Sequence, residues 1–167
     1  MKTLYLVRHA KSSWADPDQA DFERPLNERG KRDAPRMAKR LKEKEIHPDL
    51  IFSSPAKRAL STSKRMAKIL KYPKDGIKTD QKLYHASDDT LLSMIQNLKD
   101  KFECVVIVGH NPGLTDFVNS FLSEELDIDN IPTCGVVAFK LEIDAWSKAT
   151  WGIGKMLFFD YPKSKED

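Results

Sequence analysis

The chain has 167 residues, which fits one domain with a substantial hydrophobic core. Apolar residues make up 40% and charged residues 32% of it, as in ordinary folded domains, and the net charge of +3 is too small to indicate a nucleic-acid-binding surface. No leader with an apolar core and no membrane-length apolar run is found. We therefore expect a cytoplasmic protein without nucleic-acid or membrane partners.

Two cysteines and two basic clusters are interpreted structurally. Cys104 and Cys134 each lie in an apolar, strand-like segment, which favours small buried thiols rather than a disulfide. Basic residues gather at 29–40 and 57–71 without regularly spaced aromatic residues, which is typical of solvated helix faces. One domain is expected over residues 1–162, followed by a frayed tail at 163–167.

Strand-like and helix-like segments alternate along the chain. Apolar runs predict strands at 2–8, 50–52, 77–79, 104–108, 136–141 and 150–159. Apolar residues at helical spacing predict helices at 27–44, 56–70, 91–98 and 114–122. This alternation predicts an α/β domain with a mostly parallel central sheet flanked by helices on both faces. Pro35 implies either a kink in the first helix or a later start of its regular part.

Three of the predicted strands end in polar groups suited to an anion. Arg8 and His9 follow the first strand, Arg58 lies shortly after the second, and His110 follows the continuous apolar run that predicts a buried central strand. Each residue alone has an ordinary explanation, such as a solvated arginine or a core histidine. Because the carboxyl ends of parallel strands meet at one sheet edge, the set together predicts an anion site.

The turns after two of these strands share one pattern. Ser54 before Pro55, and Asn111 before Pro112, are predicted as helix N-caps with proline at the first helical position. A helix amino terminus presents unpaired N–H groups and a positive dipole, which favour an anion. Gly109 allows close approach of the backbone.

Four blocks of the sequence, in this order, resemble the histidine phosphatase superfamily and its phosphoglycerate mutase-like fold. They are Arg8-His9-Ala10, Arg24-Pro25-Leu26-Asn27-Glu28-Arg29-Gly30, Ser54-Pro55 with Arg58 and Thr62, and Gly109-His110-Asn111. Within that superfamily the chain is most similar to the short SixA-like phosphohistidine phosphatases. The similarity covers nearly the whole chain.

The resemblance implies a phosphatase that works through a covalent phosphohistidine on His9. It further implies a phosphate pocket formed by Arg8, Arg58 and His110, with Asn111 as an additional phosphate ligand. Arginine suits this task because its planar fork donates two parallel bonds and stays charged. The mechanism needs no cofactor and no metal, and the four histidines show no metal-ligand spacing.

The sequence departs from many family members at His85, where they carry a glutamate that protonates the leaving oxygen. His85 is either the proton donor here or a surface histidine before a helix capped by Ser87 or Asp88. His47, before Pro48, is interpreted as structural or solvated.

The long, irregular segment 10–26 is expected to be functional because loops of that length are uncommon in compact domains. Residues expected to line the substrate rim are Lys11, Ser12, Trp14 and Arg24, with Phe22 and the loop 123–134 beside them. Trp14 has the alternative of anchoring the loop by packing.

The expected substrate is a phosphohistidine on a partner protein. Only a short segment separates Tyr84 from the next helix, where mutases of the superfamily carry a larger lid insertion. The alternatives are a broad phosphomonoesterase acting on small phosphate-bearing substrates and a catalytically weak phosphate-binding module. A nucleotide-binding domain is disfavoured because neither glycine-rich phosphate-loop motif is present.

Overall fold

A computed structural model of the protein describes residues 1–164. Its six strands form one sheet in the order β3-β2-β4-β1-β5-β6. The strands are β1 (Lys2–Arg8), β2 (Leu50–Ser53), β3 (Lys78–Thr79), β4 (Cys104–Gly109), β5 (Val136–Leu141) and β6 (Lys155–Asp160). Strands β3, β2, β4 and β1 pair in parallel, whereas β5 is antiparallel to both β1 and β6. The predicted mostly parallel α/β sheet is confirmed.

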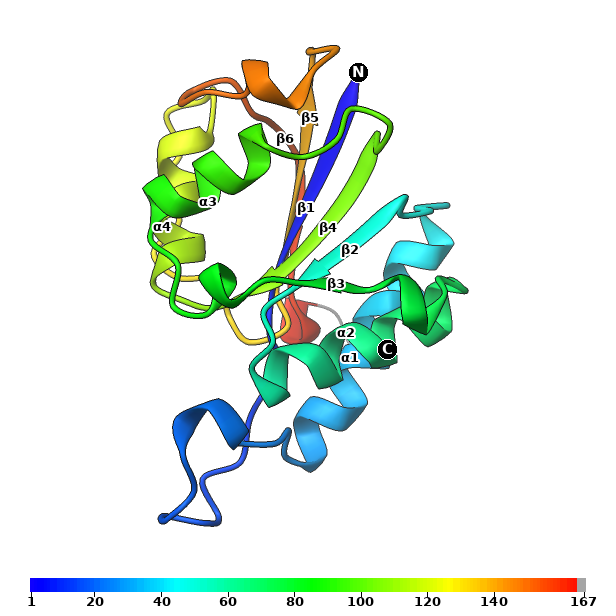
Figure 1. The fold of residues 1–167 in the computed structure, drawn as a ribbon, viewed down its shortest axis with the longest axis vertical. Coiled ribbons are helices and arrows are strands. Elements are labelled where there is room, and N and C mark those ends of the chain that lie inside the picture. Colours follow the sequence, from blue (N-terminus) through cyan, green and yellow to red (C-terminus); the bar gives the residue numbers. More distant parts are fainter. Residues whose placement is uncertain (165–167) are drawn as a thin grey trace.

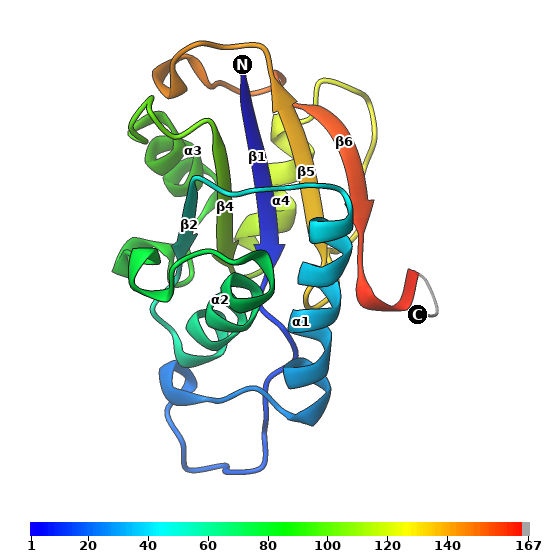
Figure 2. The ribbon, with the colours of Figure 1, turned by 90° about the vertical axis from the view of Figure 1, so that its right-hand side faces the viewer.

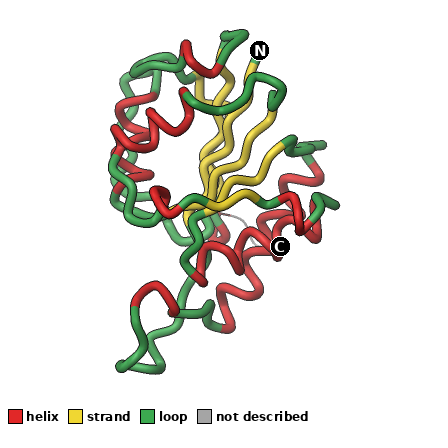
Figure 3. The backbone as a smooth tube through the Cα atoms, in the orientation of Figure 1, coloured by secondary structure: helices red, strands yellow, loops and turns green. Residues whose placement is uncertain are grey.

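Helices cover both faces of the sheet (Figures 1 and 2). They are α1 (Glu28–Glu43), α2 (Lys57–Leu70), α3 (Asp88–Gln96) and α4 (Gly113–Phe121). Figure 3 shows the strands between the two helical layers, with α3 and α4 on one face and α1 and α2 on the other.

The strand sequences explain this layering because successive side chains point to opposite faces. Leu4 and Leu6 of β1 pack in the cluster with α3 and α4, while Tyr5 and Val7 pack in the cluster with α1 and α2. Residues 105–108 of β4 are buried on both faces, as its continuous apolar run predicts. The site-bearing strands are therefore held rigidly at the centre of the molecule.

Helix α1 begins where its cap predicts. Asn27 accepts a hydrogen bond from the amide of Gly30 at 2.8 Å, and the helix continues through Pro35 to Glu43. The alternative of a later helix start is wrong. Pro35 removes only one backbone donor, and the residues on either side of it keep the apolar face buried.

The caps predicted for α2 and α4 need correction. The N-cap of α2 is Ala56, so Pro55 precedes the helix instead of opening it; the hydroxyl of Ser54 accepts from the Ala56 amide at 3.2 Å and forms the turn before it. The N-cap of α4 is Pro112, and Asn111 instead caps from one residue further out, by accepting from the amide of Thr115 at 3.1 Å.

Two element boundaries also differ from the sequence prediction. Helix α3 ends at Gln96, before Leu98, and β6 begins at Lys155 because the segment 150–154 includes a turn with Gly152 at φ 77°. Both shifts lie far from the site.

The remaining features of the chain are simple. Cys104 and Cys134 are free cysteines, as predicted. Of the predicted frayed tail, Lys163 and Ser164 form the short helical turn Pro162–Ser164, and residues 165–167 lie outside the described residues. Within residues 1–164, no helix has the length and apolar character that a membrane crossing requires.

Candidate active site

Three strand ends meet at one edge of the sheet, beside the projecting loop 10–26 (Figure 1). The parallel register places the ends of β1 at Arg8, β4 at Gly109 and β2 at Ser53 side by side. The pairing extends one residue further, because the amide of His9 donates to the Gly109 carbonyl at 3.0 Å. The residues that directly follow the three strands are His9, Ser54 and His110.

His9 is a buried, neutral imidazole, with 7% of the residue exposed. Its Nδ1 lies 2.7 Å from the carbonyl oxygen of Ala10, so Nδ1 carries the proton and Nε2 keeps its lone pair. Burial, together with the nearby cations Arg58, Arg8 and Arg24, lowers the pKa of His9 to about 4, although the bond to Ala10 opposes this. Nε2 is therefore unprotonated at neutral pH, as a nucleophilic nitrogen must be.

Arg58, in the first turn of α2, lies directly against that nitrogen. Its Nε points at Nε2 of His9 at 3.4 Å. Its two terminal nitrogens bind Asp21, with Nη1 donating to the main-chain oxygen at 2.7 Å and Nη2 donating to Oδ2 at 3.0 Å. Only 3% of Arg58 is exposed, so water screens its positive charge little.

His110 lies beside His9, with 5.1 Å between the two ring centroids. Its Nε2 is 2.8 Å from the hydroxyl oxygen of Ser54, whereas its Nδ1 is buried without a partner among the described residues. Burial and the proximity of His9 and Arg58 lower the pKa of His110 to about 3. This imidazole is therefore neutral and offers one unused ring nitrogen.

Arg8 contributes a second cation from the end of β1. Its Nη1 donates to the carbonyl of Ile131 at 2.9 Å, and its Nε is buried without a partner in the described part of the chain. Burial and the charge of Arg58 lower the pKa of Arg8. A buried donor with no acceptor is costly, and an oxyanion at this position would satisfy it.

Two residues that the sequence analysis missed complete the pocket. The Oδ2 atom of Asp21 accepts from the hydroxyl of Tyr84 at 2.6 Å, and its Oδ1 accepts from Nε of Arg24 at 3.0 Å. Although burial opposes ionisation, these hydrogen bonds and the charge of Arg58 hold the pKa of Asp21 far below its usual range. The available signals were the position of Asp21 just before the Arg24 block and of Tyr84 just before His85.

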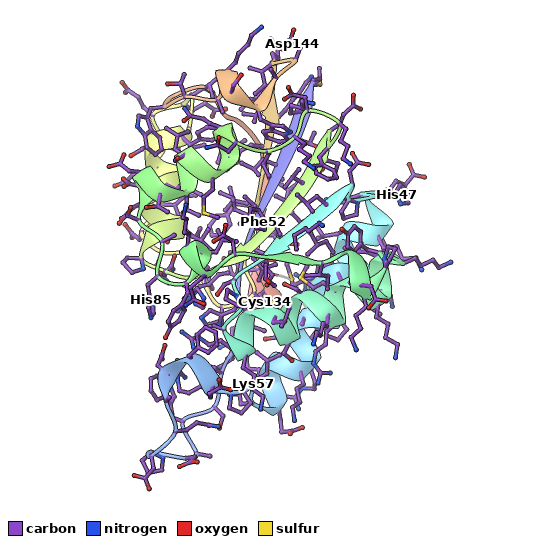
Figure 4. All side chains as sticks on the ribbon, in the orientation of Figure 1. His47, Phe52, Lys57, His85, Cys134 and Asp144 are labelled. Atoms are coloured by element: carbon purple, nitrogen blue, oxygen red, sulfur yellow. The ribbon has the colours of Figure 1, made fainter. Side chains whose placement is uncertain are left out.

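His85 reaches the site from the segment before α3. Its ring centroid is 5.6 Å from that of His110, and its Nε2 is 3.5 Å from Oδ2 of Asp21. The side chain is 57% exposed, and Ser87 caps α3 as predicted. His85 is thus both a surface histidine and a neighbour of the pocket; His47 lies far from it (Figure 4).

Asn111 does not have the role expected of it. Its side-chain nitrogen donates to Oδ1 of Asn130 and to the carbonyl of Ile131, both at 3.0 Å, and its oxygen accepts from the amide and hydroxyl of Thr115. All four hydrogen-bonding positions of the amide are occupied. The prediction that its side chain binds phosphate is therefore not supported, because each donor and acceptor of the amide is already hydrogen-bonded within the protein.

The expected rim residues lie along the loop 10–26. Arg24 is buried, donates to the hydroxyl of Ser12 at 2.6 Å, and stacks over the ring of Trp14 at 3.6 Å from the centroid. Trp14 is 76% exposed, so it is not a buried packing anchor. Lys11 is exposed, and its carbonyl accepts from the amide of Asn27.

Phe22 connects this loop to the far wall of the pocket. Its ring meets that of Tyr84 edge-on with 5.0 Å between centroids.

No group of three or more histidine, cysteine, aspartate or glutamate side chains within residues 1–164 is arranged to hold a metal ion.

The site can be compared with known proteins. Residues 4–83, which contain three of the four blocks, match the model of the histidine phosphatase superfamily, branch 1. Over this first half of the chain, the protein is similar to the histidine phosphatase superfamily. Two solved SixA structures with TM-scores of 0.80 and above share its fold over nearly the whole chain.

The first of these SixA structures, from Agrobacterium tumefaciens, is named as a candidate phosphohistidine phosphatase. It has 29% sequence identity and a TM-score of 0.80, covering 96% of this chain and 98% of its own. The second, the protein histidine phosphatase SixA complexed with tungstate, has 19% identity and a TM-score of 0.82, covering 97% and 98%. At that identity the second structure supports the fold alone.

A plant relative extends the comparison by sequence. An uncharacterised chloroplastic protein of Arabidopsis thaliana is 28% identical over 156 residues, which cover 89% of this chain and 70% of that protein. The chain thus resembles a bacterial protein in fold and a plant protein in sequence.

Proposed function

We propose that this protein is a phosphatase that accepts a phosphoryl group on Nε2 of His9 and releases it to water, with phosphohistidine on a partner protein as its substrate. The observation that carries the proposal is the contact between His9 and Ala10. It fixes the proton on Nδ1 and leaves Nε2 as a buried, neutral nucleophile beside the guanidinium of Arg58.

In the first step, the lone pair of Nε2 of His9 forms a bond to phosphorus while the bond to the leaving atom breaks. The equatorial oxygens carry the developing charge, and the unpartnered Nε of Arg8, the Nε of Arg58 and a ring N–H of His110 are the donors that meet it. The leaving nitrogen or oxygen takes up a proton from His85 or from solvent. In the second step, water attacks phosphorus and gives up a proton to His85 or to solvent, the bond to Nε2 breaks, and orthophosphate leaves.

A phosphohistidine substrate is favoured by the leaving-group side of the site. His85 is placed there with its side chain more than half exposed, and the carboxyl group beside it, Asp21, stays ionised because its pKa is held far below the usual range. The P–N bond is weak, so a departing imidazole needs less help from an acid than an alkoxide does. Only residues 85–87 separate Tyr84 from α3, which leaves room for a partner protein at the pocket.

Metal independence and a cytoplasmic location belong to this proposal. The mechanism uses only the arginine, histidine and water groups named above. Cys104 and Cys134 are free thiols, in keeping with a reducing compartment.

The proposal is tested by turnover of a phosphohistidine-bearing protein and of phosphoserine and sugar phosphate esters, with wild type and His9→Ala, in the presence and absence of a chelator. We expect hydrolysis of phosphohistidine to exceed that of the esters, no effect of the chelator, and a labelled phosphoenzyme that is lost in His9→Ala. Equal or faster ester hydrolysis would favour the phosphomonoesterase alternative. Phosphate binding without turnover would favour the binding module.

A further inference from the structure

Asp21 joins the projecting loop to the pocket, and the mechanism above gives it no task. Its carboxylate receives hydrogen bonds from Arg58, Tyr84 and Arg24, and its main-chain oxygen receives one more from Arg58. The residue belongs to the short helical turn Asp21–Glu23. A single loop residue thus contacts groups from α2, from the segment before α3 and from its own loop.

The contacts with Arg58 have a geometric consequence. A guanidinium is a rigid plane with five N–H donors in fixed directions. Two bonds from Nη1 and Nη2 to Asp21 hold one end of that plane, so the direction of the remaining Nε–H is set as well. That N–H points at the reactive nitrogen of His9, at a distance of 3.4 Å.

Asp21 leaves the catalytic edge of Arg58 open. The bonds to Asp21, at 2.7 and 3.0 Å, are shorter than the contact between Arg58 and His9. A phosphoryl oxygen on Nε2 of His9 can therefore replace the weak contact without displacing the strong ones. The carboxylate is also close to Tyr84 and His85, at 2.6 and 3.5 Å, so it orders the leaving-group side as well.

We infer that Asp21 is a positioning residue for phosphoryl transfer, holding the terminal nitrogens of Arg58 so that its Nε edge faces the phosphoryl group on His9. The inference rests on the proposed function. It also gives the loop 10–26 a function, because this loop carries the Asp21 carboxylate that orients the buried guanidinium of Arg58. Asp21 acts through Arg58 and takes no part in proton transfer.

The test compares Asp21→Asn and Asp21→Ala with wild type, using phosphoramidate as substrate and vanadate and inorganic phosphate as inhibitors. Asparagine keeps one acceptor for Arg58, so we expect kcat to fall about tenfold, whereas alanine loses both side-chain acceptors and should cost about a hundredfold. KM should change little. Vanadate, which resembles the transition state, should lose more affinity than phosphate does.

Asp18→Asn is the matched control, because Asp18 lies in the same loop, is exposed, and carries the same charge. It should change kcat less than twofold. In a double-mutant cycle, Asp21→Ala should add little to Arg58→Lys, because both changes disturb the same guanidinium position. The melting temperature of each variant shows whether a loss of activity comes from unfolding. If Asp21→Ala is unstable, Asp21→Asn alone tests the inference.

Three results would overturn the inference while leaving the proposed function standing. They are an active wild type with Asp21→Ala within twofold of it, equal losses of vanadate and phosphate affinity, or a limb of the pH–rate profile that disappears in Asp21→Asn, which would indicate proton transfer. An inactive wild type on phosphoramidate and phosphohistidine would instead remove the proposed function itself.

Discussion

The Nδ1 atom of His9 lies 2.7 Å from the carbonyl oxygen of Ala10, the next residue in the chain. A carbonyl can only accept, so this contact determines which ring nitrogen holds the proton. It also binds the imidazole to the backbone just beyond β1, whose own pairing with β4 is rigid. The proposed nucleophile is in this way oriented by the backbone that follows its own strand, in addition to its contact with Arg58.

The lowered pKa of His9 predicts a pH dependence with a definite sign. Between pH 6.5 and about 4, an unfolded His9 is protonated and the folded one is neutral, so the unfolded state binds more protons. The free energy of unfolding should therefore fall as the pH decreases through this window. The lowered pKa of His110 should make the same contribution between pH 6.5 and about 3.

Imidazole titrations followed by NMR, with urea unfolding at pH 7, 5.5 and 4.5, check this prediction. His9→Ala and His110→Ala should each lose stability less steeply than wild type over the same range. A midpoint near 6.5 for His9 in the folded protein would contradict the buried, neutral nucleophile.

Arg58→Ala should cost about 3–4 kcal/mol of transition-state stabilisation, roughly a hundred- to thousandfold in kcat. The buried charge of Arg58 is aimed at the reacting nitrogen, so its loss is felt mainly in the transition state. Arg58→Lys keeps the charge but loses the fork, and we expect it to recover only part of the rate. Lys57→Ala, which removes an exposed cation one residue earlier, is the control and should stay within twofold of wild type.

The sequence predicted the fold because short apolar runs alternate along it with segments of helical spacing. The continuous apolar runs of β1 and β4 predicted buried strands of a mostly parallel sheet, and the structure confirms this. Parallel register then brings the residues after the strands together, so the proximity of His9, Arg58 and His110 followed from local motifs.

What the sequence could not provide depends on contacts between distant, irregular segments. Asp21 lies in a loop with no periodic pattern, and its partner Arg58 is far along the chain, so nothing local signals their pairing. Asn111 shows the converse case. The local sequence correctly indicated that Asn111 caps a helix. Its side-chain amide, which was expected to bind phosphate, instead donates hydrogen bonds to Asn130 and to the carbonyl of Ile131 in a distant loop.

Ser54 should determine which nitrogen of His110 carries its proton. The Ser54 oxygen accepts from the Ala56 amide, and we expect the Ser54 hydroxyl to donate its own proton to Nε2 of His110, which would leave the proton of His110 on Nδ1. Nδ1 is the ring nitrogen without a partner among the described residues, and as an N–H it suits a phosphoryl oxygen. Ser54→Ala should lower kcat about tenfold, because it removes the one hydrogen bond that holds His110 in this tautomer.

The neighbouring Ser53→Ala is the matched control for Ser54, because Ser53 is equally buried but bonds to Ser63 and to the main chain, away from His110. It should leave kcat within twofold of wild type. Nitrogen chemical shifts of His110 should report an Nδ1–H form in wild type that is mixed with the Nε2–H form in Ser54→Ala. A wild-type spectrum with the proton on Nε2 would reverse the assignment.

His85 provides the last prediction, which separates substrates by their leaving groups. If its imidazole protonates the departing atom, removing it should slow phosphate esters more than phosphoramidates, because an alkoxide needs the proton more than a departing amine does. The backbone of His85 has φ 56°, a left-handed conformation in which alanine is strained and asparagine is tolerated.

His85→Asn is therefore the informative variant, since it removes the titratable group and keeps the turn. We expect its kcat on phosphoserine to fall about tenfold or more and its kcat on phosphoramidate to stay within about threefold. His47→Asn, at the other end of β2, controls for loss of a histidine elsewhere. Equal effects on both substrate classes would remove His85 from proton transfer and leave it as an exposed neighbour of Asp21 and His110.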